Sequence, residues 1–217
     1  MKDKCSTSSE RIAQTINSLR RNGFDAWYVN SHIEAEQLFW DEIYKKVIPL
    51  TASWGDSMTL HSTGILTRLR EEPGIELIET FGGHLTREQQ INNRKRALSC
   101  DMFLTGSNAV TVRGQLVNLD MVGNRVAGIA FGPGNVVIFI GVNKIVDNID
   151  EAVNRIKTVA APLNAKRHPE FNTPCAVTGE CADCNSPKRI CNTWAITEKS
   201  YPIGRIKIIL INEQLGL

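Results

Sequence analysis

The sequence lacks a long hydrophobic run and an apolar leader. Its longest apolar stretch, residues 136–142, is far shorter than the roughly 18 residues that a membrane-spanning helix needs. The first eleven residues, MKDKCSTSSER, are polar and contain no apolar segment typical of a signal peptide. We therefore expect a cytoplasmic protein that does not contact a membrane.

The sequence also lacks an excess of charge of one sign. It has 25 Lys and Arg against 23 Asp and Glu, a formal net charge of +2. Binding nucleic acid needs basic side chains gathered to neutralise phosphates. The short basic run 94–96 lies in a helical pattern and fits a solvent-facing helix surface. We therefore expect no nucleic-acid partner.

Apolar segments and helical patterns alternate along most of the chain, which is 217 residues long and 42% hydrophobic. Strands are predicted at 26–29, 50–54, 76–79, 102–105, 136–140 and 206–211, with a hairpin at 111–119. Helices are predicted at 12–19, 31–44, 58–70, 86–99, 123–131 and 150–160, the last ending before Pro162. This order predicts an α/β fold with a mostly parallel sheet flanked by helices.

Four of the six cysteines lie within 17 residues, in the pattern Cys175-x5-Cys181-x2-Cys184-x6-Cys191. The surrounding segment, 168–192, is rich in Pro, Asn, Gly and Cys and has no apolar period, so burial alone does not order it. In a reducing compartment, grouped cysteines indicate metal or redox chemistry rather than disulfides. Because thiolates are soft ligands, we predict that these four cysteines bind one metal centre.

The spacing of the cysteines bears on the identity of the metal. Structural zinc sites use two knuckles, each with closely spaced ligands, whereas this segment has only the pair Cys181 and Cys184. The x5/x2/x6 order resembles the x6/x2/x5 loop of the 4Fe–4S DNA glycosylases, although the rest of the chain does not resemble them. A 4Fe–4S cluster is the expected cofactor, and zinc is the alternative. Four thiolate ligands leave no iron open, which favours electron transfer or structural support.

Three loops carry residues suited to a small anion. The loops of Gly55 and Gly106 follow predicted strands, where parallel sheets collect ligands. At 123–125 a helix is predicted to begin, and free N–H groups there beside an Arg would favour a carboxylate or phosphate. Asp120 could act as a base or orient a hydroxyl. Ordinary turns use the same residue types, so it is the combination that indicates a site. The candidates are Asp120 as a catalytic residue, and Gly55, Ser57, Gly106, Asn108, Gly123, Asn124 and Arg125 as ligand-binding residues.

Several segments resemble the lactate-utilization (LUD-domain) family in its short single-domain form. They are WGDSMT at 54–59, LTGSNA at 104–109, VNLDMVGNRVA at 117–127, FGP at 131–133, GVNKIV at 141–146 and AAPLNA at 160–165. The segment 173–191 is similar to a branch of that family that carries the cysteine cluster. The resemblance implies a fold related to ribose-5-phosphate isomerase and CoA transferases, and a link to oxidation of lactate or a similar 2-hydroxy acid. We expect an α/β LUD-like domain at 1–165 and 193–217, and a cysteine-rich metal-binding loop at 166–192.

Two functional hypotheses follow from these observations. The leading one is a redox-associated cytoplasmic protein of lactate or related 2-hydroxy-acid utilization, which binds a small carboxylate or phosphate and carries an iron–sulfur cluster. An electron-transfer partner protein would serve such a cluster, and a homo-oligomer is compatible with it. The alternative is a non-catalytic anion-sensing or assembly module with a structural zinc site.

Overall fold

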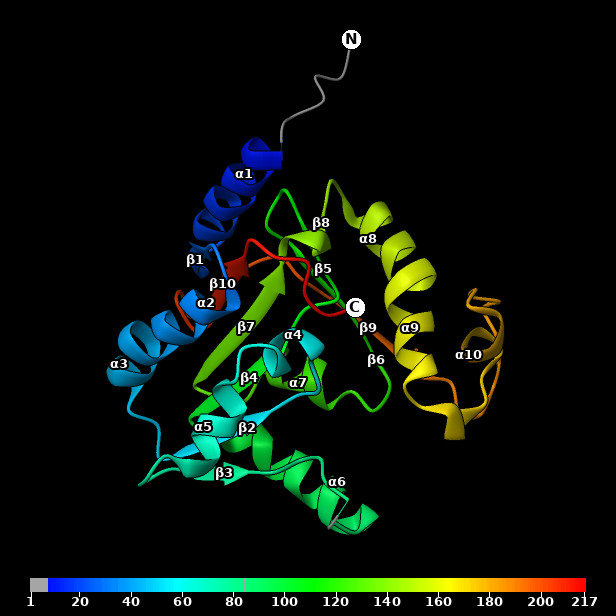
Figure 1. Cartoon of the computed structure of the whole chain (residues 1–217), viewed down its shortest axis with the longest axis horizontal. Helices are drawn as coiled ribbons and strands as arrows, with labels where there is room; N and C mark the ends of the chain where they lie inside the picture. Colours follow the sequence, from blue (N-terminus) through cyan, green and yellow to red (C-terminus); the bar gives the residue numbers. More distant parts are fainter. Residues whose placement is uncertain (1–7, 84) are drawn as a thin grey trace.

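The computed structural model describes residues 8–83 and 85–217. Its centre is a six-stranded sheet with the order β1-β10-β7-β4-β2-β3 (Figure 1). Every neighbouring pair in this sheet is parallel. The strands are β1 (Asp25–Val29), β2 (Thr51–Trp54), β3 (Glu76–Ile78), β4 (Met102–Gly106), β7 (Asn135–Gly141) and β10 (Ile206–Ile211). The α/β fold with a mostly parallel sheet is confirmed.

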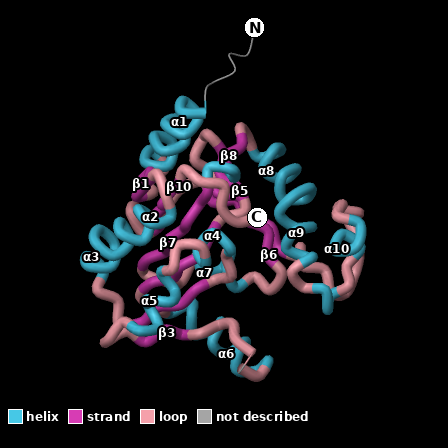
Figure 2. The backbone as a smooth tube through the Cα atoms, in the orientation of Figure 1, coloured by secondary structure: helices cyan, strands magenta, loops and turns pink. Residues whose placement is uncertain are grey.

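Helices cover both faces of the central sheet, which is why its middle strands are almost continuously apolar. On one face, Phe39, Leu60 and Leu69 pack against β4 and β7. On the other, Leu19 and Ile129 pack against alternate residues of the same strands. Figure 2 shows these helices around the strands. The helices of the first face are α2 (His32–Leu38), α3 (Lys45–Val47), α4 (Met58–His61) and α5 (Ile65–Glu71), and α1 (Ser8–Arg21) and α7 (Asn124–Ala130) lie on the second.

A second, four-stranded sheet has the order β8-β5-β6-β9. Its strands are β5 (Ala109–Thr111), β6 (Leu116–Asp120), β8 (Ile145–Val146) and β9 (Thr193–Thr197). The pair β5–β6 is the predicted hairpin. Strand β9 was not predicted; it follows the cysteine segment and pairs antiparallel with β6, with Thr193 opposite Asp120. The chain therefore returns from the cysteines directly onto the strand that ends in Asp120.

The helix predicted to end before Pro162 continues through it, and that prediction is wrong. Helix α8 (Ile149–Arg155) passes through a π-helical turn, Ile156–Ala160, into α9 (Ala161–Lys166). Pro162 lies in the first turn of α9. A proline lacks the N–H of a regular helix, and the wider π turn before it removes the need for the usual hydrogen bond at that position.

Two other predicted helices differ in detail. The helix at 58–70 is divided into α4 and α5 by Gly64, which has a left-handed φ of 74°. The helix that follows Thr86 is α6 (Arg87–Arg96), and Thr86 and Gln89 form a capping box at its start. A 3-10 turn then completes the predicted span at Ala97–Ser99.

The cysteine segment packs beside α9 (Figure 1) and contains the short helix α10 (Pro174–Thr178), which carries Cys175. The five described cysteines form no disulfide. Among residues 8–83 and 85–217, no helix has the length and apolar character needed to cross a membrane. Residues 1–7, which form part of the stretch used for the signal-peptide expectation, lie outside the described residues.

Candidate functional site

The carboxyl ends of β2 and β4 lie side by side in the central sheet. From β2 the chain proceeds to β3 at one edge, whereas from β4 it proceeds toward the other side of the sheet. This divergence of two loops is the position at which α/β sheets bind ligands. Gly55 and Ser57 follow β2, and Gly106 and Asn108 lie at the end of β4. The structure therefore brings these four predicted residues together.

Two glycines allow the loops to approach so closely. A Cβ atom on Gly106 would collide with the side-chain oxygen of Ser57. A Cβ atom on Gly55 would lie 2.9 Å from Oγ1 of Thr105 and 3.2 Å from Cγ of Arg125. Glycine is required at such positions for steric reasons rather than for backbone freedom.

Arg125 ties the loops together through its guanidinium group. Its Nη1 donates to the carbonyl of Gly106 (3.4 Å) and to Oδ1 of Asn118 (3.2 Å). Its Nη2 donates to Oδ1 of Asn108 (2.8 Å) and to the carbonyl of Leu119 (2.7 Å). Both terminal nitrogens are thus engaged by the protein, so Arg125 positions the site residues around it.

Asp120 caps the start of α7 with its carboxylate. Its Oδ2 accepts hydrogen bonds from the backbone N–H groups of Arg125 (3.0 Å) and Val126 (3.2 Å), and its Oδ1 accepts one from Met121 (2.8 Å). Free backbone donors were expected at this helix start. Two of them are bound instead by the protein's own carboxylate, which supplies the negative charge that such a terminus favours.

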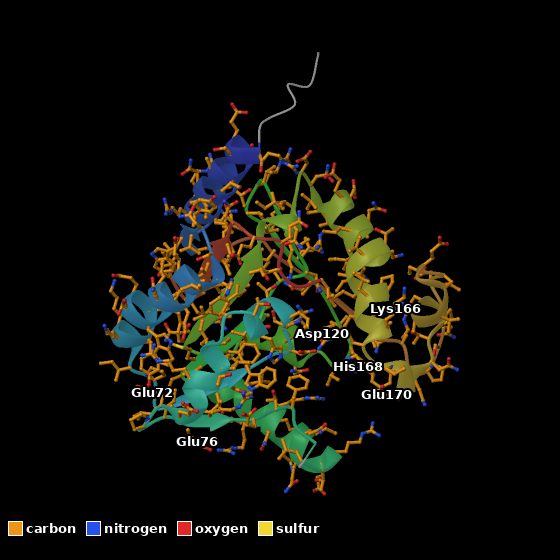
Figure 3. The ribbon with its side chains drawn as sticks, viewed as in Figure 1. Glu72, Glu76, Asp120, Lys166, His168 and Glu170 are labelled. Carbon is orange, nitrogen blue, oxygen red and sulfur yellow. The ribbon has the colours of Figure 1, made fainter. Side chains whose placement is uncertain are left out.

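Gly123 and Asn124 lie at the beginning of α7, away from the packed loops. Gly123 has a left-handed φ of 94°, and the position of a Cβ atom there is open. The structure therefore does not bring these two predicted residues into contact with Gly55 or Gly106. Figure 3 places Asp120 between the central sheet and the segment that carries His168.

A buried lysine at this edge of the sheet was not among the predicted residues. Lys144 ends a 3-10 turn, Val142–Lys144, directly after β7, and only 4% of it is exposed. Its Nζ donates to Oγ1 of Thr59 (2.8 Å). Burial, together with the positive charges of Arg155 and Arg125, lowers the pKa of Lys144 to about 7. In the sequence, the segments around Lys144 and Thr59 stand out only for their resemblance to the LUD-domain family.

Arg155 of α8 was also missed. Its Nε donates to the carbonyl of Asn143 (3.2 Å) and its Nη1 to the carbonyl of Asn108 (2.7 Å). Within the described part of the chain, no hydrogen bond engages Nη2 of Arg155. Desolvation lowers the pKa of this guanidinium. Arg155 therefore adds positive charge to the site and retains donors for a ligand.

Asn118 provides one more donor. Its Oδ1 accepts from the backbone N–H of Asn108 (3.2 Å) and from Arg125. Its Nδ2 is buried and has no partner among the described residues. Buried donors without a partner are uncommon in native proteins, and a bound ligand can satisfy such a donor.

Asp56 links the site to the cysteine segment. Its carboxylate contacts Nη1 of Arg167 (3.1 Å) and Nε2 of His61 (3.4 Å). Burial is the largest single influence and acts to raise the pKa of Asp56, but hydrogen bonds and charges from His61 and Arg167 together lower it to about 2. Because Arg167 directly follows α9, this ion pair fastens the chain just before the cysteines.

All four predicted metal-binding cysteines line one partly enclosed cavity of about 60 Å³. The other walls of this cavity include Leu119, Thr173, Ile190 and Trp194. Among the described residues, no three His, Cys, Asp or Glu side chains are grouped tightly enough for a single metal ion. The thiols therefore surround a shared space without converging on one point.

An arginine lies against the cysteine segment. Arg189 donates from Nε to Sγ of Cys191 (3.3 Å) and from Nη1 to the carbonyl of Cys184 (2.6 Å). Arg189 thus places a positive charge beside Sγ of Cys191. By contrast, burial raises the pKa of the isolated Cys100 to about 12, so Cys100 is a packing residue.

Strand β6 joins the cysteine cavity to the group of site residues around Arg125. Leu119 lines the cavity, and the next residue is Asp120. Asn192, which follows Cys191, donates its backbone N–H to the carbonyl of Asp120 (3.0 Å) and its Nδ2 to the carbonyl of Met121 (3.1 Å). The two predicted sites are therefore in direct structural contact.

Comparisons with known proteins agree with this architecture. The crystal structure of a DUF162 family protein from Deinococcus radiodurans is similar over 95% of this chain and 99% of that one, with 14% sequence identity and a TM-score of 0.53. At that identity the likeness concerns the fold. No curated protein sequence matches the chain. The family described as LUD domain matches residues 12–211, a span that includes the central sheet, the loops of Gly55 and Gly106, and all four clustered cysteines. The chain belongs to the LUD-domain family.

Proposed function

We propose that this protein is a redox-associated cytoplasmic component of lactate or related 2-hydroxy-acid utilization. In this proposal it binds a small carboxylate or phosphate at the β2–β4 edge, holds a 4Fe–4S cluster on Cys175, Cys181, Cys184 and Cys191, and exchanges electrons with a partner protein. Membership of the LUD-domain family supports the metabolic assignment.

The observation that carries the proposal is the shared cavity of the four cysteines. A single zinc ion would need four ligand atoms at about 2.0–2.3 Å from one point, and the described thiols are not grouped in that way. A 4Fe–4S cluster distributes its thiolates over four irons, and when bound it supplies one-electron transfer. The donor set, all thiol, suits either iron or zinc, and the presence of only one closely spaced pair, Cys181 and Cys184, favours the cluster over a two-knuckle zinc site.

The residues of the cavity would hold and tune such a cluster. The four thiolates would be its ligands, and Leu119, Ile190 and Trp194 would limit the access of water. The N–H of Arg189 that bonds Cys191 is of the kind that shifts a cluster's potential upward, because it stabilises negative charge on sulfur.

The charges at the β2–β4 edge support an anionic ligand. Arg155 has no carboxylate partner within 4 Å among the described residues, and Asp120 is bound to the amides of α7. The free donors of Arg155 and Asn118 would bind the oxygens of a carboxylate or phosphate. The contact between Asn192 and Asp120 would keep this ligand close to the cluster.

The test begins with protein purified without oxygen and supplied with iron and sulfide. We expect a brown protein with about four irons per chain and a paramagnetic signal on reduction. Cys184→Ser should lower the iron content, whereas Cys100→Ser is the matched control and should not. Colourless protein that retains one zinc under these conditions would overturn the cluster and favour the anion-sensing alternative.

Ligand binding is tested separately by calorimetry with lactate, pyruvate and phosphate. Lactamide, which has the shape of lactate without its charge, is the control ligand. Binding of one of the anions but not of lactamide is expected. Equal heats for lactate and lactamide would contradict an anion site.

A further inference from the structure

The amine of Lys144 lies at the carboxyl end of β7 beneath a short covering segment, residues 213–216. Thr59 donates its hydroxyl to the carbonyl of Leu215 (3.1 Å) and accepts from Lys144. The backbone of Gly216 lies so close that a Cβ atom there would collide with Oγ1 of Thr59 and lie 2.9 Å from Nζ of Lys144. The amine is therefore shielded from bulk water.

Lys144 has fewer hydrogen-bond partners than a buried structural cation usually has. Its only hydrogen bond among the described residues is to one hydroxyl. The half-buried Lys207 offers a comparison, because its Nζ donates both to Oδ1 of Asn135 (2.9 Å) and to the carbonyl of Gly204 (2.6 Å). The charged groups that act on Lys144 are Arg155 of α8 and Arg125 of α7, both positive. This environment favours the uncharged amine, the nucleophilic form of lysine.

We propose that Lys144 is a carbonyl-reactive amine, which forms an imine with a short 2-oxo acid whose carboxylate is bound by Arg155. The inference rests on the proposed function, since a 2-oxo acid is what oxidation of a 2-hydroxy acid yields. It adds a covalent step and a residue that the proposed function does not require.

The step is balanced without an oxidant or a reductant. The nitrogen lone pair of Lys144 attacks the C2 carbonyl carbon and a C–N bond forms. The nitrogen gives up its two protons, the former carbonyl oxygen gains two and leaves as water with the breaking of the C–O bond, and a C=N bond remains. The hydroxyl of Thr59, 2.8 Å from the amine, is placed to donate a hydrogen bond to the carbonyl oxygen during the addition, once the covering segment has released it.

The ligand class follows from the groups around the amine. Nη2 of Arg155 is unengaged by described residues and matches one carboxylate, so an acid is expected rather than a neutral ketone. The covering segment limits the length of the ligand. It is held by two backbone-donated bonds, Val142 N–H to the carbonyl of Glu213 and Leu215 N–H to Oδ1 of Asn143, each 3.2 Å long. The Thr59 hydroxyl also bonds the carbonyl of Leu215, and Nδ1 of His32 lies 2.9 Å from Oε2 of Glu213. These contacts must open locally before a ligand can reach the amine.

The experiment traps the imine with sodium borohydride in the presence of pyruvate, on the full chain. Intact mass should show one reduced pyruvyl adduct, and peptide mapping should place it on Lys144. Lys144→Arg should abolish this adduct, and Lys207→Arg, which alters the half-buried amine used above for comparison, should leave it unchanged. Acetone, which lacks the carboxylate, should label Lys144 at least tenfold more slowly than pyruvate does.

No adduct in the folded wild-type protein, an adduct spread over exposed lysines, or an adduct retained in Lys144→Arg would each overturn the inference. Circular dichroism of every variant checks that folding is intact, and Thr59→Val gives a second check, because it should slow trapping while leaving Lys144 in place.

Trapping is repeated on iron-free protein. An adduct there, without any cluster formed on reconstitution, would refute the proposed cluster and leave Lys144 supported. Binding of lactate in calorimetry without any adduct would refute the reactive Lys144 and leave the proposed anion site supported.

Discussion

The backbone N–H of Asn192 donates to the carbonyl of Asp120 over 3.0 Å. The chain that follows Cys191 is therefore bonded to β6, the strand that ends at Asp120 beside Arg125. Between Arg167 and Asn192 the segment has few buried apolar side chains, Ile190 being one of them. We therefore predict that a metal centre on the cysteines contributes to the order of this segment.

Cys184→Ser should loosen this segment without unfolding the sheet. Limited proteolysis of the reconstituted protein should cut the variant within 168–192 at least several-fold faster than the wild type, while its main unfolding transition changes little, because the core clusters consist almost wholly of residues outside that segment. Cys100→Ser provides the comparison. Equal rates of cleavage in all three proteins would show that the segment is ordered without a metal centre.

Asp120→Ala should destabilise the protein by about 1–2 kcal/mol, the typical effect of removing a helix-capping side chain. The carboxylate is bonded to three backbone N–H groups, including that of Arg125, and alanine leaves them without an acceptor. Chemical denaturation measures the change. Asp120→Asn keeps one acceptor oxygen and should cost less. A variant as stable as the wild type would mean that water replaces the carboxylate at no cost.

Gly106→Ala should cost about 1–3 kcal/mol, the range for overpacking a closely packed region. The added methyl group would meet the side chain of Ser57, and the carbonyl of Phe139 lies only 3.3 Å from its position. Gly134→Ala is the matched control, because its nearest neighbour is the carbonyl of Asp101 at 3.6 Å, an ordinary contact. If both variants unfold at the same denaturant concentration as the wild type, the loops are less closely packed than these distances indicate.

The stability of the wild type relative to Lys144→Met should depend on pH. The pKa of Lys144 is about 7 in the folded protein and about 10.4 in an unfolded chain, so between these values the unfolded state binds more protons and stability rises with pH. Below about pH 7 the folded protein carries the full penalty of a buried charge, on the order of 3–5 kcal/mol.

The difference in unfolding free energy between the two proteins, measured by denaturation from pH 6 to 10, should therefore move in favour of the wild type as the pH rises. Taking the difference cancels the titration of other groups. Lys144→Met should be at least as stable as the wild type at pH 6, because methionine fills a similar volume without a charge. A difference that stays constant over this range would place the folded pKa near its ordinary value.

Much of the central sheet could be predicted from the sequence because its strands are buried on both faces. Runs such as 102–105 and 136–140 are apolar without alternation, and short turns separate them from helical patterns. The predicted positions of Gly55, Ser57, Gly106 and Asn108 at one edge of the sheet agree with the structure, since parallel strands place their carboxyl ends together. The gathering of the cysteines in one cavity agrees with their spacing, and the metal they bind stays a prediction.

Residues whose importance comes from tertiary packing could not be found in this way. Lys144 and Arg155 have the sequence surroundings of ordinary surface cations, and only the covering segment and α8 reveal their environment. Strand β9 was missed because Trp194 and Ile196 are 40% and 47% exposed, so the strand shows no clear buried face. The continuity of α8 and α9 depends on a π-helical turn that has no sequence signature of its own.

The place of β10 in the sheet has a consequence for how the molecule is made. This strand comes after every other described helix and strand in the chain, yet it lies between β1 and β7. Until residues 206–211 have been synthesised, β1 has no neighbour and one edge of β7 is open. The cysteine segment precedes β10 in the chain, so its four thiols are synthesised while the central sheet is still incomplete. Closure of the sheet by a strand so distant in sequence also gives the fold a high contact order, which slows folding.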